Sequence, residues 1–395
     1  MTQDVLFRGA SVLVGRSRLD RVDVRVADGL VVEVGAELSA HGAREVRAEG
    51  KLLAPAFVDL HVHGAHGAMF EEGEETSVRK ILAALPRYGV GGVLATIAAL
   101  PERELLRAVR AVVRASEGAD GAAVLGIHLE GPFLNPLRAG AQSLAALRPP
   151  NLQEWERILE AASGRVRMVT VAPELEGATE LVEAATRAGI VASVGHSDAD
   201  EGCVERAVAA GARHVTHLYN AMRGFHHRET GPVGVALTDD RVSVELVCDG
   251  HHVSRRAVEI AWRCKPEGKL VLVTDAVAAL GMPEGEIRLF GVPCRIADGA
   301  VRLASTGQLA GSCLSLDRAV RTLRGWFPAL PLARVLWAAS GAPCEVLGLR
   351  ERGEISPGRV ADLVLLDEKL EVVATMCRGV FRYGNADVAD RMRGS

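Results

Sequence analysis

A chain of 395 residues, of which 48% are hydrophobic and 24% charged, is long enough for a large core and a small second domain. Its net charge of -4 gives no electrostatic reason to expect nucleic acid or an anionic membrane as a partner. The seven cysteines include no C-x-x-C pair, which favours reduced thiols over a disulfide framework or a zinc ribbon. The first residues lack a basic and an apolar signal region, and no apolar stretch reaches about 18 residues. We therefore expect a soluble, cytoplasmic protein.

Both ends of the chain show the alternation of apolar and polar residues that is typical of half-buried strands. Gly and Asp separate these short runs, as tight turns require. The runs cover residues 5–7, 11–14, 22–26, 30–34, 361–367 and 372–376. They predict one small β-sandwich domain that is formed by both termini, from residues 1–52 and 346–395.

In the middle of the chain, apolar runs alternate with helical periodicity. Eight strand-like runs cover residues 53–60, 91–98, 123–130, 165–172, 190–195, 214–219, 242–248 and 269–275. Helical patterns cover residues 102–114, 152–162, 178–188 and 202–210. This alternation indicates βα units and a parallel sheet, and eight units favour a (β/α)8 TIM-type barrel over residues 53–345. The sequence contains no G-x-G-x-x-G motif and no Walker loop, so nothing in it indicates a nucleotide site.

Two histidines follow the first of these apolar runs. Residues i and i+2 of a strand lie on the same face, so His61 and His63 emerge side by side where the strand ends. This geometry suits one metal ion. The alternative interpretation is that both are polar loop residues, and the pair alone does not decide between the two.

Four further polar residues stand at the ends of other runs: Glu130, His196, His217 and Asp275. In a TIM-type barrel the carboxyl ends of the strands share one face, where functional groups gather. Imidazole and carboxylate ligands suit Zn or Fe in an open, catalytic site. The alternative, that each residue merely ends its strand, has to hold at five strand ends at once. The pattern therefore predicts a divalent metal centre.

The predicted ligands indicate a hydrolytic reaction. A divalent ion lowers the pKa of its water from about 15.7 towards 7 and polarises a carbonyl oxygen. Asp275, at the last strand, could take the proton of the water and return it to a leaving amine. No lysine stands at these strand ends, so Glu130 is the candidate for the role that a carboxylated lysine plays between two metals. The chemistry is hydrolysis of an amide or a related bond.

Several motifs resemble the amidohydrolase superfamily and, within it, the family of N-acetylglucosamine 6-phosphate deacetylases. The specific ones are H-L-E-G-P-F at 128–133 and T-H-L-Y-N-A-M at 216–222. Others stand at 55–64, 171–174, 195–197, 249–253, 274–276 and 309–312, so that the resemblance runs nearly from end to end. The stretch 353–364 is shared across the superfamily and says little about function.

The resemblance implies a role for each predicted ligand. Glu130, His196 and His217 would hold the principal metal. The pair His61 and His63 would hold a second ion where two are bound, since some relatives bind one. Asp275 would be the acid/base that transfers the proton.

The resemblance also implies a sugar-phosphate pocket and a homodimer. The residues implied in substrate binding are Ala141, Gln142, Asn220, Ala221, Arg228, Asp249, Gly250, His251, His252, Leu309, Ala310 and Gly311. A guanidinium pairs well with phosphate, which suits Arg228, and the phosphate site of the family lies near the neighbouring subunit. Without the flanking motif, Arg228 would be interpreted as a solvated loop residue. Of the two adjacent histidines, the family motif selects His252.

One position departs from the family pattern. Many relatives have a histidine that helps to polarise the acetyl carbonyl where this chain has Gln142, whose amide donates a hydrogen bond but carries no charge. The implied reaction is hydrolysis of the N-acetyl group of N-acetylglucosamine 6-phosphate to glucosamine 6-phosphate and acetate. Alternatives are another N-acylated amino sugar phosphate, such as N-acetylgalactosamine 6-phosphate, or an N-acyl amino acid. A catalytically inactive scaffold is disfavoured, because every predicted ligand and Asp275 are present.

Overall fold

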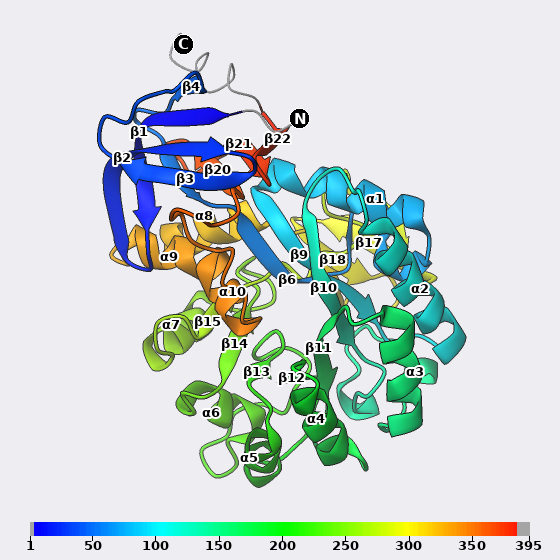
Figure 1. Ribbon diagram of the computed structural model, residues 1–395. Coiled ribbons are helices and arrows are strands. Elements are labelled where there is room, and N and C mark those ends of the chain that lie inside the picture. The colour runs from blue at the N-terminus through cyan, green and yellow to red at the C-terminus, as the bar shows by residue number, and fades with distance from the viewer. Residues whose placement is uncertain (1–3, 385–395) are drawn as a thin grey trace.

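A barrel of eight parallel strands forms the centre of the protein, which confirms the predicted fold class (Figure 1). The computed structural model describes residues 4–384. In barrel order the strands are β6 Phe57–Val62, β9 Val90–Ala98, β10 Ala123–Glu130, β11 Val166–Val171, β12 Val191–Val194, β13 His214–Val215, β14 Ser243–Leu246 and β15 Leu270–Leu272. A parallel bridge between Val62 and Ala276 joins the first strand to the segment after the last one.

Helices surround the barrel strands. They are α1 Glu75–Ala84, α2 Glu102–Ala115, α3 Leu152–Ala162, α4 Ala178–Arg187, α5 Glu201–Ala210, α6 Gly231–Thr238, α7 Arg255–Cys264, α8 Leu316–Trp326, α9 Leu332–Ala339 and α10 Gly341–Val346. Short 3-10 turns are η1 Phe70–Glu72, η2 Leu85–Tyr88, η3 Pro136–Arg138 and η4 Leu144–Ala146. The four predicted helices match α2 to α5 within one residue at each end, and the side chain of Asn151 caps α3 by accepting the amide of Glu154. Among residues 4–384, no helix has the length and apolar character of a membrane span.

The first predicted run, 53–60, divides between two sheets. Its beginning lies in β5 Leu52–Pro55, which pairs with a C-terminal strand, and its end lies in β6. The change takes place at Ala56, whose amide donates to Asp362 O, whereas the next amide, of Phe57, donates to Gly89 O beside the barrel. The proposed limits 1–52, 53–345 and 346–395 stay predictions, and residues 385–395 lie outside the described part of the chain.

Both termini contribute to one mostly antiparallel sheet beside the barrel, as predicted (Figure 1). Its strands are β1 Val5–Val14, β2 Arg18–Ala27, β3 Leu30–Gly35, β4 Arg44–Arg47, β5, β20 Leu363–Leu366, β21 Val372–Cys377 and β22 Val380–Tyr383. The runs 5–7 and 11–14 form a single strand, because a register shift between Phe7 and Ala10 keeps the pairing with β2. This sheet has its own apolar core, separate from that of the barrel.

An additional four-stranded antiparallel sheet follows the last barrel strand and was not predicted. It consists of β16 Gly285–Leu289, β17 Val292–Ala297, β18 Ala300–Leu303 and β19 Leu309–Ser312. A bridge from Ala276 to Ser312 attaches it to the barrel, and it has a small core of its own. A two-stranded hairpin, β7 Gly64–Ala65 and β8 Ala68–Met69, follows the first barrel strand. Both insertions lie after the carboxyl ends of barrel strands.

Candidate metal centre and active site

A cavity of about 500 Å³ lies at the carboxyl ends of the barrel strands. Its lining includes His63, Glu130, Leu137, Arg138, Gly140, Ala141, Gln142, His196, His217, Asn220, Ala221, His252, Asp275, Val277, Phe290, Arg302, Gln308, Leu309 and Gly311. Every predicted ligand except the fully buried His61, together with several predicted substrate residues, thus lines one cavity. Its place agrees with the usual location of active sites in this fold.

The first cluster of possible ligands contains His61, His63 and Asp275. The two histidines stand at the end of β6, and their Nε2 atoms are 3.3 Å apart. One oxygen of Asp275 lies 3.6 Å from each of these nitrogens. Asp275 has a φ of +51°, an uncommon conformation that turns the chain after β15. The same-face geometry expected of His-x-His is therefore present.

The second cluster contains Glu130, His196 and His217, which stand at or just after the ends of β10, β12 and β13. Glu130 Oε1 lies 3.0 Å from His196 Nε2 and 2.9 Å from His217 Nε2. Both histidines have positive φ values, 48° and 29°, because the chain leaves its strand abruptly at each of them. For this reason the predicted run 214–219 is too long: the strand ends at Val215, and the turn after it places the ring of His217 in the cavity.

The donor chemistry of both clusters fits a divalent cation. Within each cluster the ligand atoms lie within 4.8 Å of one another. The Nε2 atoms of His196 and His217 are only 3.0 Å apart, so their lone pairs oppose each other unless a proton or a cation lies between them. Glu130 connects the clusters, since its second oxygen lies 3.2 Å from His63 Nε2. Nitrogen and oxygen donors in this arrangement suit Zn or Fe.

Three of the four candidate ligand histidines have a hydrogen-bond acceptor at Nδ1, the ring nitrogen that faces away from the other ligands. His61 Nδ1 lies 3.0 Å from Glu245, His63 Nδ1 lies 2.6 Å from Glu71, and His196 Nδ1 lies 2.8 Å from the carbonyl of Arg138. A ring that donates from Nδ1 presents the lone pair of Nε2, and metal-binding histidines are usually held in this way. The exception is His217, whose buried Nδ1 has no partner among the described residues.

The carboxylates set the charge of this buried region. Burial alone would lower the pKa of His61, but Glu130 and Glu245 outweigh it and raise the pKa well above the usual value. Burial would likewise lower the pKa of His63, which Glu71 and Glu130 raise to about 10. For Glu130, burial opposes ionisation, but the neighbouring histidines hold its pKa well below the ordinary range. The site therefore attracts cations, whether protons or a metal ion.

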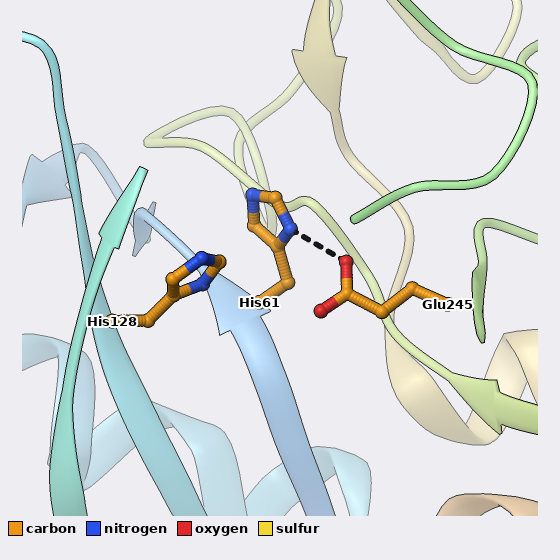
Figure 2. Close-up of side chains that lie close together, drawn as sticks. All are labelled: His61, His128 and Glu245. Atoms are coloured by element: carbon orange, nitrogen blue, oxygen red, sulfur yellow. Dashed lines mark hydrogen bonds and ion pairs between the residues drawn. The ribbon is translucent and has the colours of Figure 1, made fainter. Parts of the chain in front are cut away.

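His128 lies against the candidate ligand His61, and its own hydrogen bonds give it another role. Figure 2 shows its ring beside His61, on the side away from Glu245, and the ring centroids are 4.9 Å apart. Its Nε2 pairs with Thr170 Oγ1 at 2.8 Å. Burial, together with His61, lowers the pKa of His128 to about 3, so this ring stays neutral. It is therefore a hydrogen-bonded neighbour of the candidate ligands.

The predicted substrate residues separate into two groups. Seven line the cavity: Ala141, Gln142, Asn220, Ala221, His252, Leu309 and Gly311. The other five do not contribute to its lining: Arg228, Asp249, Gly250, His251 and Ala310. Asp249 acts on the cavity indirectly, because it pairs with His252 Nδ1 at 2.6 Å, whereas His251 is exposed.

Arg228 is exposed in the turn between β13 and α6 and lies outside the cavity of its own chain. Within residues 4–384 its side chain contacts only His227 at hydrogen-bond distance, and no carboxylate pairs with it. Arg302 of β18, unlike Arg228, lines the cavity. Like Arg228, it has no carboxylate partner among the described residues. The structure thus presents two arginines that could contact an anion.

Sequence reasoning missed several residues in and around the site, among them Glu71, Glu245, Phe290, Arg302 and Gln308. Glu245 could have been noticed as a charge inside the apolar run 242–248. The alternating stretches 285–289 and 292–297, separated by Phe290-Gly291, are typical of a hairpin. That hairpin brings the ring of Phe290 to 6.2 Å from that of His63. No sequence signal distinguishes Glu71 within the acidic stretch 71–75.

The chain is similar to known proteins along nearly its whole length. The model of the amidohydrolase family matches residues 52–382. N-acetylglucosamine-6-phosphate deacetylase of Bacillus subtilis is 34% identical over 386 residues, which cover 96% of this chain and 97% of the relative. N-acetylgalactosamine-6-phosphate deacetylase of Escherichia coli O157:H7 is 35% identical over 376 residues, which cover 95% and 98%.

A solved structure supports the same relationship. The N-acetyl-D-glucosamine-6-phosphate deacetylase of Mycobacterium smegmatis, as a variant in complex with its N-acetylated sugar phosphate, superimposes with a TM-score of 0.91 at 34% identity. The match covers 96% of this chain and all of that one. The expected superfamily resemblance is therefore confirmed.

Proposed function

The chain belongs to the amidohydrolase family, and we propose that it hydrolyses the N-acetyl group of N-acetylglucosamine 6-phosphate to give glucosamine 6-phosphate and acetate. The observation that carries this proposal is that residues of two possible ligand clusters, Asp275 among them, line one cavity. Relatives with this activity in their names align over nearly the whole chain. The volume of about 500 Å³ is within the usual range for small-molecule sites.

N-acetylgalactosamine 6-phosphate is the second candidate substrate. A relative named for that sugar is 35% identical, against 34% for one named for the glucosamine sugar, so identity does not separate the two epimers. An N-acyl amino acid is a weaker alternative, because the cavity offers Arg302 and the Asp249-paired His252 to a phosphate.

For the metal centre we propose one or two divalent ions, Zn or Fe. Glu130, His196 and His217 would hold the principal ion, and His61 with His63 the second. A bound ion lowers the pKa of water from about 15.7 towards 7 and polarises the carbonyl of the substrate. The pairing of three ligand rings with acceptors at Nδ1 supports this assignment, because Nε2 is then left for the ion.

The residues of the chain would carry out the proton transfers and the positioning. Asp275 would take the proton of the attacking water and deliver it to the leaving nitrogen, which becomes the amine of glucosamine 6-phosphate. Gln142 reaches the same cavity and has an amide N–H for the acyl oxygen. Backbone groups of Ala141, Leu309 and Gly311 would contact the sugar.

For the phosphate we propose contacts from Asn220, Ala221, His252 and Arg302 of the same chain. Arg228 would contribute only from a second copy, since it lies outside the cavity of its own chain. This arrangement requires the homodimer that the family resemblance implies. A guanidinium binds phosphate through two parallel N–H donors, so either arginine is suited to this role.

We also propose a cytoplasmic enzyme with no nucleic acid or membrane partner. All seven cysteines are free, as is usual in a reducing compartment. The net charge of -4 offers no general attraction for polyanions.

Acetate release from three sugars tests the proposed reaction: N-acetylglucosamine 6-phosphate, N-acetylgalactosamine 6-phosphate and unphosphorylated N-acetylglucosamine. We expect the first to have the highest kcat/KM and the unphosphorylated sugar the lowest. Higher kcat/KM for the galactosamine sugar would transfer the assignment to that epimer. No acetate from any of the three would refute the proposal.

A further inference from the structure

One oxygen of Glu245 contacts both ligand clusters. Glu245 Oε2 accepts a hydrogen bond from His61 Nδ1 at 3.0 Å, and the pair is joined by the dashed line in Figure 2. The same oxygen accepts the backbone N–H of His217 at 2.9 Å. His61 belongs to the cluster with His63 and Asp275, whereas His217 belongs to the cluster with Glu130 and His196. A single oxygen atom therefore contacts one candidate ligand residue from each of the two clusters.

Glu245 is itself held in place. It lies in β14, its side chain is fully buried, and its second oxygen pairs with His214 Nε2 at 3.1 Å. The other ring nitrogen of His214 pairs with Ser243 Oγ at 2.6 Å. Because both carboxylate oxygens are engaged, the side chain has little freedom to follow one ligand and release the other.

We propose that Glu245 is a positioning residue that couples the two ion sites, so that an ion bound at one site favours binding at the other. The proposal rests on the metal centre of the proposed function and goes beyond it. The accepted hydrogen bond keeps the proton of His61 on Nδ1, which leaves Nε2 for an ion. The contact with the amide of His217 holds that residue at its φ of 29°, which an unconstrained chain rarely adopts.

The coupling follows from the ordering of shared groups. An ion bound by His61 fixes that ring, and thereby fixes Glu245 Oε2. The amide of His217, and with it the ligand ring of the second site, is then already ordered when the next ion arrives. A site that is ordered in advance binds its ion with a smaller loss of conformational entropy.

Glu71 provides a matched comparison. It is also a buried carboxylate that accepts from the Nδ1 of a ligand histidine, here His63 at 2.6 Å. Within residues 4–384 it also accepts the amide of Ala98 at 2.9 Å, and Ala98 is not a candidate ligand. Glu71 thus touches one cluster, whereas Glu245 touches both. The change from glutamate to glutamine is the same at both positions.

The test is a titration of Zn²⁺ into metal-free protein, with a competing chelator and direct determination of the bound metal. Wild type is expected to bind two ions cooperatively. Glu71→Gln should weaken one ion but leave the intrinsic affinity of the other site, and the cooperativity between the two sites, unchanged. Glu245→Gln should weaken both by about 10–100-fold and abolish cooperativity, as loss of a hydrogen-bond partner behind a ligand commonly does.

Equal effects of Glu245→Gln and Glu71→Gln, each on one ion, would overturn the coupling, as would a single bound ion in wild type. Binding of no ion to the wild type would refute the metal centre itself, and the coupling with it. Ser243→Ala is the structural control, because it disturbs the same network at His214 without touching a ligand, and it should bind both ions normally. If Glu245→Gln does not fold in a thermal melt of the metal-free form, Glu245→Asp keeps the charge but retracts the oxygen, and should also weaken both ions.

Discussion

Gln142 Nε2 donates a hydrogen bond to Glu130 Oε2 over 2.6 Å. Its Oε1 accepts the amide of Ala99 at 2.8 Å, so the orientation of the side-chain amide is fixed. The amide group has two N–H bonds, and one remains for a ligand in the cavity. Where the family resemblance implies a histidine, this chain therefore has a neutral donor that is hydrogen-bonded to a candidate metal ligand.

Gln142→Ala is expected to lower kcat by roughly a hundredfold or more, because one donor to the developing oxyanion is lost. KM should change little, since the donor acts mainly in the transition state. Steady-state kinetics on the phosphorylated sugar measure both constants. Gln308→Ala, at another glutamine that lines the cavity, is the control and should leave kcat within a few fold of the wild-type value. A wild-type kcat for Gln142→Ala would remove Gln142 from the mechanism.

Asp275→Asn is expected to keep bound metal and to lose turnover. The amide has nearly the shape of the carboxylate but cannot accept and return the proton of the attacking water. Metal content and acetate release should be measured on the same sample. Hydrolysis at the parent rate would show that another group transfers the proton, whereas loss of metal would assign Asp275 to ion binding.

We expect substitutions of Arg302 and Arg228 to affect phosphate binding differently. Arg302→Gln should raise KM for the phosphorylated sugar by about 10–100-fold, which corresponds to one charge-assisted hydrogen bond, and should not affect the unphosphorylated sugar. Arg228→Gln should have a similar effect only if a second copy brings its guanidinium to the cavity. The oligomeric state in solution therefore belongs to the same experiment. An unchanged KM for Arg302→Gln would exclude a contact between Arg302 and phosphate.

The fold was largely predictable because its signals are local. Apolar runs and helical periodicity located α2 to α5 and the barrel strands, and a histidine or carboxylate at a strand end is visible without knowledge of contacts. The same reasoning could not assign a role to Glu71 or Glu245. Their roles depend on contacts with His63 and His61, eight and 184 positions away along the chain.

The sheet β16–β19 was missed for a different reason. Residues 276–345 were assigned to the barrel as a whole, although β16 and β17 alternate in burial as strands with one exposed face do. Phe290, Arg302 and Gln308 reach the cavity from this insertion, so the missed element also concealed three lining residues. Arg228 shows the opposite case, since a motif selected it although its position in one chain places it outside the cavity.

The pair of Asp249 and His252 predicts a pH dependence of substrate binding. Burial would lower the pKa of His252, but the carboxylate 2.6 Å away outweighs it and raises the pKa above 6.5. The protonated ring should therefore bind phosphate above pH 6.5 and lose this contact as the pH rises through the raised pKa. Because the pKa of His252 is higher in the folded protein, its pairing with Asp249 stabilises the fold fully below pH 6.5, the approximate pKa in the unfolded chain. This stabilisation is lost as the pH rises through the pKa of His252 in the folded protein.

The measurement is KM between pH 7 and 10, where the phosphate keeps its charge. KM for the phosphorylated sugar should rise with pH, and KM for the unphosphorylated sugar should not. Asp249→Asn keeps the side-chain oxygen that accepts the amides of His251 and His252 but lacks the charge, so the rise should begin at a lower pH. A pH profile that Asp249→Asn leaves unchanged would contradict this role of the pair.

Removal and return of the metal test the central claim most directly. Protein treated with a chelator should release no acetate from N-acetylglucosamine 6-phosphate, and stoichiometric Zn²⁺ or Fe²⁺ should restore the activity together with the bound metal. Full acetate release by protein that is shown to contain no metal would contradict the account.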